Sequence, residues 1–102
     1  MSLSLDSELI QNAGNGNLDM VLDLLYRGTN VNAKDNLLGK TALMCASENG
    51  NLEVVRALLN FEDVDVNIKD NSGCTALDLA CKEENDDVAR LLEGFSGLNL
   101  CA

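Results

Sequence analysis

The sequence predicts an all-α fold, a solenoid of three stacked helix-turn-helix units joined by short β-hairpin or loop fingers. The first observation is a repeat of fixed period, because Thr41-Ala42-Leu43 recurs as Thr75-Ala76-Leu77 and Gly39 recurs as Gly73. The second is that each copy holds two apolar stretches with helical spacing. Such a period is typical of stacked repeats, in which each unit buries its apolar face against the next.

The 102 residues suffice for one domain, which we divide into units at about 5–36, 37–70 and 71–94, with a C-terminal tail at 95–102. In the first unit we expect helices over 7–14 and 17–26. Their inward-facing apolar residues are Leu9, Ile10, Met20, Val21, Leu24 and Leu25. This unit lacks the Thr-Ala-Leu opening, as expected of a terminal unit that has one face in water.

The middle unit carries the clearest signals for two helices. The Thr41 hydroxyl can cap the first helix, which we expect to end near Asn49-Gly50, where Gly supplies a left-handed turn. We expect Asn51 to cap the second helix. Its apolar residues Val54, Val55, Leu58 and Leu59 fall at spacings that make one buried stripe. The two helices therefore form an antiparallel pair.

The segments between the helix pairs are polar and end in Gly. Residues 30–39 and 63–73 combine polar/apolar alternation with Asn, Ser and Gly, which indicates short extended hairpins. These are the predicted fingers.

The third unit departs from the pattern at its turn and at its end. Glu84 replaces the turn glycine, so a residue with a side chain must adopt or avoid the left-handed conformation, at a cost of about 1 kcal/mol. We expect the last helix to end at Gly94. For the tail, two alternatives stay open: it folds back as a cap through Phe95, Leu98 and Leu100, or it is loose.

Composition restricts the function. The chain has 17 acidic and 7 basic residues, a net charge of −10, which disfavours nucleic acid and favours a basic protein surface as a partner. It contains no His, no phosphate-binding Gly loop and no close Cys pairs, so we predict no enzymatic activity, no cofactor and no metal site. We expect the four cysteines to be reduced thiols. Neither a secretory signal nor a membrane span is predicted, which favours the cytoplasm, with the nucleus as an alternative.

One acidic run, residues 83–87, has two interpretations. It could be a patch for calcium or for a basic partner. Alternatively, Asp86 and Asp87 lie in the first turn of a helix, where the helix dipole favours anions. Asp19 and Glu53 occupy the same place in the other units, which supports the second interpretation.

Several motifs together resemble the ankyrin repeat: Asn-(Ala/Ile)-Lys-Asp-Asn, Gly-x-Thr-Ala-Leu, and a helix that closes on Asn-Gly-Asn-Leu-Glu-Val-Val. The resemblance implies an L-shaped stack with fingers at right angles to the helices. It also implies that the chain binds proteins through the fingertips and through the concave face formed by the first helix of each unit. The family's Thr-Pro-Leu-His opening is here Thr41-Ala42-Leu43-Met44 and Thr75-Ala76-Leu77-Asp78, without its Pro and His.

The resemblance implies a set of partner-binding residues. Those on the fingers are Lys34, Asn36, Leu37, Leu38, Lys40, Lys69, Asn71, Ser72 and Cys74. Those on the concave face are Met44, Glu48, Asn49, Asp78, Lys82 and Glu83. The alternative for the lysines is that they are ordinary solvated side chains. The alternative for the two leucines, which otherwise suit an apolar anchor, is that they pack against Met44.

From these observations we expect a monomeric, non-catalytic module that binds another protein. The alternative is a structural segment of a longer repeat assembly, or a chain that associates with itself. The polar outer helix of the third unit favours the first possibility through Asp86, Asp87, Arg90 and Glu93.

Overall fold

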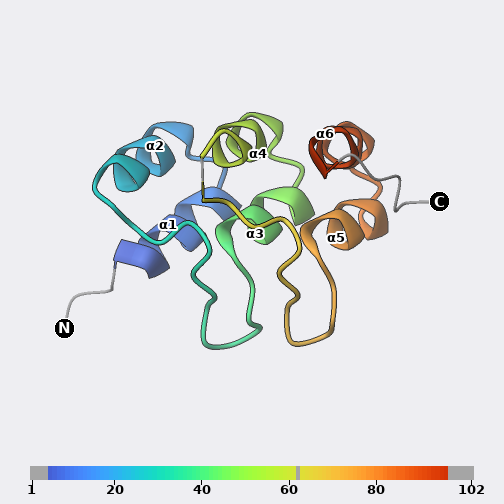
Figure 1. Cartoon of the computed structure of the whole chain (residues 1–102), viewed down its shortest axis with the longest axis horizontal. Helices are drawn as coiled ribbons and strands as arrows, with labels where there is room; N and C mark the ends of the chain where they lie inside the picture. The colour runs from blue at the N-terminus through green and yellow to red at the C-terminus, as the bar shows by residue number, and fades with distance from the viewer. Residues whose placement is uncertain (1–4, 62, 97–102) are drawn as a thin grey trace.

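The computed structural model describes residues 5–61 and 63–96, and these form six helices and no strand. The helices are α1 Leu5–Gly14, α2 Leu18–Tyr26, α3 Ala42–Glu48, α4 Leu52–Leu59, α5 Ala76–Lys82 and α6 Asp86–Ser96. They make three two-helix layers: layer 1 is α1 and α2, layer 2 is α3 and α4, and layer 3 is α5 and α6 (Figure 1). The inner helices α1, α3 and α5 stack in one row and the outer helices in another. The predicted all-α repeat stack is confirmed.

An aliphatic core runs through all three layers. Leu24 of layer 1, Leu58 of layer 2 and Val88 of layer 3 are each exposed by 1% or less. In layer 1 the residues expected to face inward are buried except for Met20, whose exposed fraction is 36%. The expectation for Met20 is therefore wrong.

Two segments form the fingers, which project beside the inner helices (Figure 1). Finger 1 is residues 30–41 and finger 2 is residues 64–75. Each is closed by a backbone hydrogen bond, from Asp35 N to Lys40 O and from Asp70 N to Cys74 O, both 2.9 Å. The fingers are thus loops of turns rather than β-hairpins.

Threonine side chains start the inner helices of layers 2 and 3. Thr41 Oγ1 accepts a hydrogen bond from the N–H of Met44 at 3.2 Å, as predicted. Thr75 and Asp78 form a reciprocal capping box, in which each side chain accepts from the other's backbone N–H. These caps satisfy N–H groups that have no partner inside the helix.

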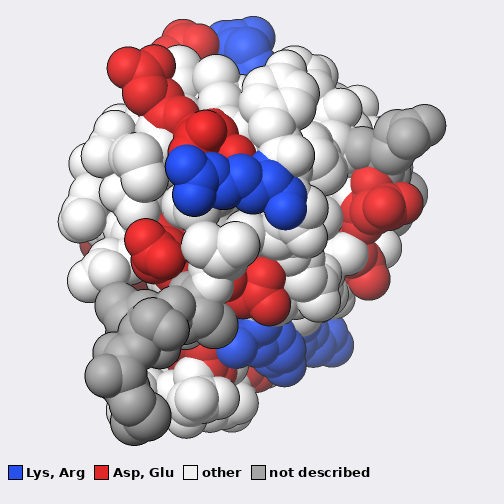
Figure 2. Space-filling model, turned by 90° about the vertical axis from the view of Figure 1, so that its left-hand side faces the viewer, with Lys and Arg blue, Asp and Glu red and all other residues white. Residues whose placement is uncertain are grey.

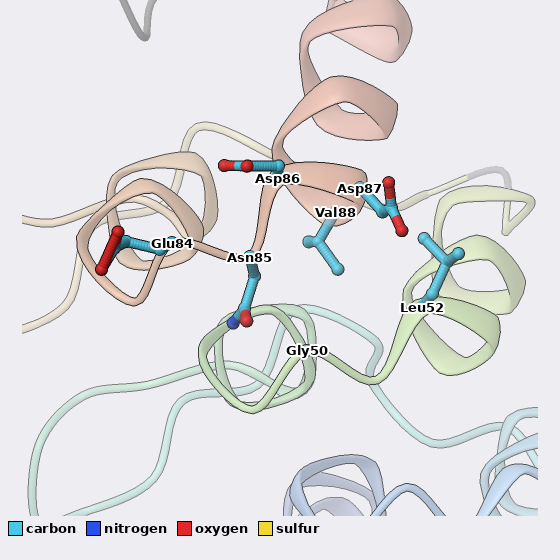
Figure 3. A pocket seen from close by; sticks show the side chains of 7 residues that line it. All are labelled: Gly50, Leu52, Glu84, Asn85, Asp86, Asp87 and Val88. Atoms are coloured by element: carbon cyan, nitrogen blue, oxygen red, sulfur yellow. The ribbon is translucent and has the colours of Figure 1, made fainter.

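The asparagines before the outer helices have another role. Asn51 is the N-cap residue of α4, as predicted, but its side chain makes no capping hydrogen bond. Its Nδ2 instead donates to the carbonyls of Ala13 and Gly14 in layer 1, both at 3.0 Å. In the same way Asn85 donates to Ser47 O at 2.8 Å and Glu48 O at 2.9 Å, with its side chain directed at the end of α3 (Figure 3). Each asparagine therefore satisfies the last-turn carbonyls of the preceding layer.

The turn between the helices of each layer requires a positive φ. Gly16 and Gly50 supply it with φ values of 74° and 73°. Glu84 adopts the same conformation with φ 59°. Glu84 therefore adopts the strained left-handed conformation rather than avoiding it.

The last helix is longer than predicted. It continues through Gly94 to Ser96, so the expected end at Gly94 is wrong. Phe95 lies on this helix and is half exposed. Leu98 and Leu100, the other residues of the proposed cap, lie outside the described residues.

The cysteines differ from one another. Cys45 and Cys74 are free thiols, whereas Cys81 is disulfide-bonded, so the prediction of reduced thiols is wrong for Cys81. Cys101 lies outside the described residues. Burial raises the pKa of the Cys45 thiol to about 11, so it stays protonated and unreactive at neutral pH.

Candidate protein-binding surface

An aspartate carboxylate organises each fingertip. Asp35 Oδ1 accepts hydrogen bonds from the N–H groups of Leu37, Leu38 and Gly39 at 3.1, 2.7 and 2.9 Å. The equivalent Asp70 accepts from Ser72 at 2.8 Å and Cys74 at 3.0 Å. Such contacts between an aspartate and the backbone that follows it fix the turn. The tips are therefore ordered by their own residues before any partner arrives.

These hydrogen bonds also hold the two carboxylates in the ionised form. Burial alone would raise the pKa of Asp35, but the N–H groups of Leu38, Gly39 and Leu37 outweigh it and bring the pKa below 3.8. The N–H of Cys74 is the main cause of the lowered pKa of Asp70. This role was not among the predictions, although the aspartate recurs at the same position in both fingers.

The two fingers are joined at their tips. The backbone N–H of Asn71 donates to Leu38 O at 2.9 Å, and its Nδ2 donates to Leu37 O at 3.3 Å. Gly39 allows this approach, because a Cβ there would lie 2.5 Å from Asn71 Oδ1. A side chain at position 39 would displace the Asn71 side chain from its contact with Leu37 O.

The fingers are also joined at their bases. Asn32 Nδ2 donates to Asp63 O at 2.7 Å, and Asn32 Oδ1 accepts from the N–H of Asp65 at 2.8 Å. Contacts at both ends make the pair one continuous surface rather than two independent loops.

Most of the side chains predicted to bind a partner are accessible. Those exposed are Lys34, Asn36, Leu37, Leu38, Asn49, Lys69, Asn71, Ser72, Asp78, Lys82 and Glu83. Lys40, Glu48 and Cys74 are half-buried. The residues of this set are brought together along the fingers and the adjacent inner helices.

Met44 is the exception, and the prediction for it is wrong. Its exposed fraction is 1%. Layer 3 packs on α3 through α5, and its Asn85 meets the carbonyls of Ser47 and Glu48 at the end of α3. Met44 belongs to the aliphatic core that the layers share.

Lys40 and Glu48 contact each other rather than standing free. Lys40 Nζ lies 2.6 Å from Glu48 Oε1, which links finger 1 to the end of α3. The hydrogen bond to Glu48 is the main cause of the raised pKa of Lys40. The pair removes one lysine and one acid from the charges that a partner would meet.

Leu37 and Leu38 project into solvent, with exposed fractions of 86% and 55%. The alternative that they pack against Met44 is therefore wrong. Leu37 borders a shallow pocket together with Ser7, Ile10 and Gln11 of α1 and Asp35 of finger 1. These α1 residues were not among the predicted binding residues. The available signal was that Ile10 occupies in layer 1 the position of Met44 and Asp78.

The acidic run at the start of α6 lines a second pocket, which Figure 3 shows between Glu84, Asn85, Asp86, Asp87 and Val88 on one side and Gly50 and Leu52 on the other. Asp86 and Asp87 lie in the first turn of α6. This placement is the helix-capping arrangement weighed above. Within the described ranges no group of three or more Asp, Glu, Cys or His side chains is arranged to hold a metal ion.

Among the residues that the structure describes, none of the helices has the length and apolar character needed to cross a membrane.

Comparison with known proteins places these features in a family. A family model described as ankyrin repeats in three copies matches residues 9–100. The rat ankyrin repeat and SAM domain-containing protein 6 is 37% identical over 79 residues, which are 76% of this chain and 9% of that protein. An ankyrin repeat protein of Rickettsia bellii (strain RML369-C) is 35% identical over 77 residues, 76% of this chain and 78% of that protein. "Probable E3 ubiquitin-protein ligase XBOS33" of Oryza sativa subsp. japonica is 41% identical over 88 residues, 86% of this chain and 17% of that protein.

The chain thus spans a small part of the rat and rice relatives and about three quarters of the Rickettsia protein. The three repeats of the family model correspond to the three layers of the structure. The chain belongs to the ankyrin-repeat family.

Proposed function

We propose that this chain is a non-catalytic module that binds another protein through its fingertips and the concave surface of α3 and α5. Ankyrin repeats are in general protein–protein interaction modules. The observation that carries the proposal is the exposed, internally ordered tip of finger 1, where Leu37 and Leu38 stand on a backbone held by Asp35 and Asn71. A surface that is ordered before binding loses little conformational entropy on association.

The chemistry of the side chains supports a non-catalytic role. The chain has no His, the usual acid–base group near neutral pH. Cys45 is protonated at neutral pH, and Asp35 and Asp70 are engaged with backbone N–H groups. We also propose that the chain is a cytoplasmic monomer.

Two matched variants test the binding surface. Leu37→Ser with Leu38→Ser removes the apolar tip of finger 1. Tyr26→Ser removes a side chain that is 85% exposed on the outer helix α2. Affinity capture from a cell extract, with identification by mass spectrometry, should lose its specific partner with the finger variant and keep it with the Tyr26 variant. Equal capture by both, with unchanged circular dichroism, would move the site away from finger 1.

A second candidate function is a structural one, as part of a longer repeat assembly or by self-association. It is favoured by the small share, 9% and 17%, that the matched region makes of two relatives. Sedimentation equilibrium distinguishes the two: the proposed module stays monomeric, whereas a concentration-dependent dimer would favour the structural role.

A further inference from the structure

The basic side chains are divided between two faces of the molecule, and the two groups differ in whether they form ion pairs. All three arginines belong to the outer row or its ends, and each has an acidic partner close by in sequence. The distances are 3.0 Å for Arg27–Asp23, 3.7 Å for Arg56–Glu53 and 3.9 Å for Arg90–Asp87. The outer face therefore offers cations that are already locally neutralised.

The lysines lie on the opposite side, on the fingers and α5. Lys40 is paired with Glu48. Lys34, Lys69 and Lys82 are exposed, and none of them forms an ion pair within residues 5–61 and 63–96. In the end-on view of Figure 2, basic side chains lie low on the surface, at the height of the fingers in Figure 1, as well as in the middle and at the top, and acidic side chains lie beside them.

Lys34 and Lys69 occupy the same position of two joined fingers, each directly before the aspartate that orders its tip. Asp35 and Asp70 are ionised and reduce the positive potential beside each lysine, but their carboxylates accept from backbone N–H groups, and among the described residues they form no ion pair with Lys34 or Lys69. With these two aspartates counted among the proposed binding residues, four lysines and five acids leave a net charge of −1, while the whole chain carries −10.

The backbone of the two leucines at the tip is engaged in hydrogen bonds within the protein. The N–H groups of Leu37 and Leu38 both donate to Asp35, and their carbonyls both accept from Asn71. Both N–H donors of this dipeptide are therefore engaged, and each carbonyl already accepts one hydrogen bond, so pairing with a partner strand is disfavoured. The leucine side chains are the main groups that the tip offers, with the pocket against Ile10 and Gln11 beside them.

We propose that the fingers bind an acidic segment of a partner protein that carries a large apolar residue, with its carboxylates facing Lys34 and Lys69 and its apolar side chain on Leu37. This proposal rests on the proposed function and names the chemistry of the partner. The net charge of the chain points the other way, toward a basic partner. Local charges dominate at contact, because salt at physiological strength screens charges beyond about 8 Å. Complementary charges at an interface then decide which partner is accepted.

A displayed library of random peptides supplies the probe. Selection on the intact chain should enrich peptides with several Asp or Glu residues around one Leu, Ile, Phe or Met. A selected peptide, labelled with fluorescein, is then measured by anisotropy against the protein and its variants. Lys34→Glu with Lys69→Glu should weaken binding about tenfold, since two exposed ion pairs are replaced by repulsion. Arg27→Glu with Arg56→Glu makes the same change of net charge on the outer face and should alter the affinity less than about twofold.

The outcomes separate this inference from the proposed function. Selected peptides that are basic, or acidic peptides whose affinity is equal for the two charge-reversed variants, would overturn the inference. If such peptides still lose affinity with Leu37→Ser and Leu38→Ser, the finger surface remains the binding site. A library that yields no binder would count against both proposals.

Discussion

Layers 2 and 3 are built from the same repeat, yet equivalent residues differ in what they contact. Met44 is buried in layer 2, whereas Asp78, its equivalent in the next repeat, is exposed. Gly39 lies against the neighbouring finger, whereas Gly73 has nothing within 4 Å of a Cβ placed on it. Layer 2 has a neighbour on both sides and layer 3 has a described neighbour on one side only. A position in the repeat therefore defines the conformation of a residue, and the layers that pack against it define its burial.

Substitution of the fingertip glycines should give the largest loss in the free energy of unfolding. Gly39→Ala introduces a side chain at φ 70° and displaces the Asn71 side chain, so we expect it to lower the free energy of unfolding by about 2 kcal/mol. Gly73→Ala meets no neighbour and should cost only about 1 kcal/mol from its φ of 83°. Urea unfolding followed by circular dichroism measures both. Equal losses would mean that contact between the fingers contributes nothing to stability.

The asparagines that join the layers should give the next largest effect. Asn85→Ala leaves the carbonyls of Ser47 and Glu48 without their donor, at a cost of about 1–2 kcal/mol. Asn51→Ala should cost somewhat less, because Gly14 O keeps its hydrogen bond from Asn49 Nδ2. Asn17 has no layer before it in the described structure, and its Nδ2 donates to Asn12 Oδ1 of its own layer at 3.1 Å. Asn17→Ala is therefore the control, expected to cost less than about 0.5 kcal/mol. A control as damaging as Asn85→Ala would show that these residues matter only for their own layer.

Ser47 offers a stabilising change in layer 2. Its hydroxyl is fully buried and makes no hydrogen bond, while layer 1 has Ala13 at the same position. Ser47→Ala should raise the free energy of unfolding by about 1 kcal/mol, because it removes a buried polar group without a partner. Ser72→Ala, on the exposed tip of finger 2, should change it by less than about 0.5 kcal/mol. A loss of stability in Ser47→Ala would indicate that the hydroxyl is satisfied in solution.

Glu84 tests whether the turn of layer 3 is strained relative to that of layer 2. Glu84→Gly restores the residue found at Gly50 and should raise the melting temperature through a gain of about 0.5 kcal/mol, the relief at φ 59° less the added entropy of the unfolded chain. Glu83→Gly, at φ −91°, should lower it instead. Thermal unfolding of both variants gives the comparison, and a lower melting temperature for Glu84→Gly would contradict it.

The smallest effect we predict is a pH dependence shared by the two fingers. The pKa values of Asp35 and Asp70 are lowered by folding, so their contribution is present above the usual pKa of 3.8 and is lost as the pH falls through the folded values. Thermal unfolding between pH 6 and pH 3 should show this loss. Asp35→Asn and Asp70→Asn should each flatten the acid side of the profile. An unchanged profile in both variants would assign the acid sensitivity to other carboxylates.

The local features that the sequence predicted correctly share a physical origin. The Thr41 cap, the turn at Gly50 and the apolar stripe of α4 depend on residues a few positions apart, whose chemistry is visible in a single unit. The exposed tip at Leu37 and Leu38 was predictable for the same reason. The main errors concern contacts between units. The Asn51 side chain was interpreted as a helix cap because its partner carbonyls lie in the preceding unit, far from it in the sequence.

By itself the sequence determined the repeat, the helix pairs, the place of the fingers and the family, since a fixed period and short-range signals specify each unit. Only the tertiary structure decided which repeat positions are covered by a neighbouring layer, which lysines remain unpaired among the described residues and how Asn71 fixes the tip of finger 1. The physical reason is that these properties arise where two units meet, and the energy of such a contact depends on side chains from both.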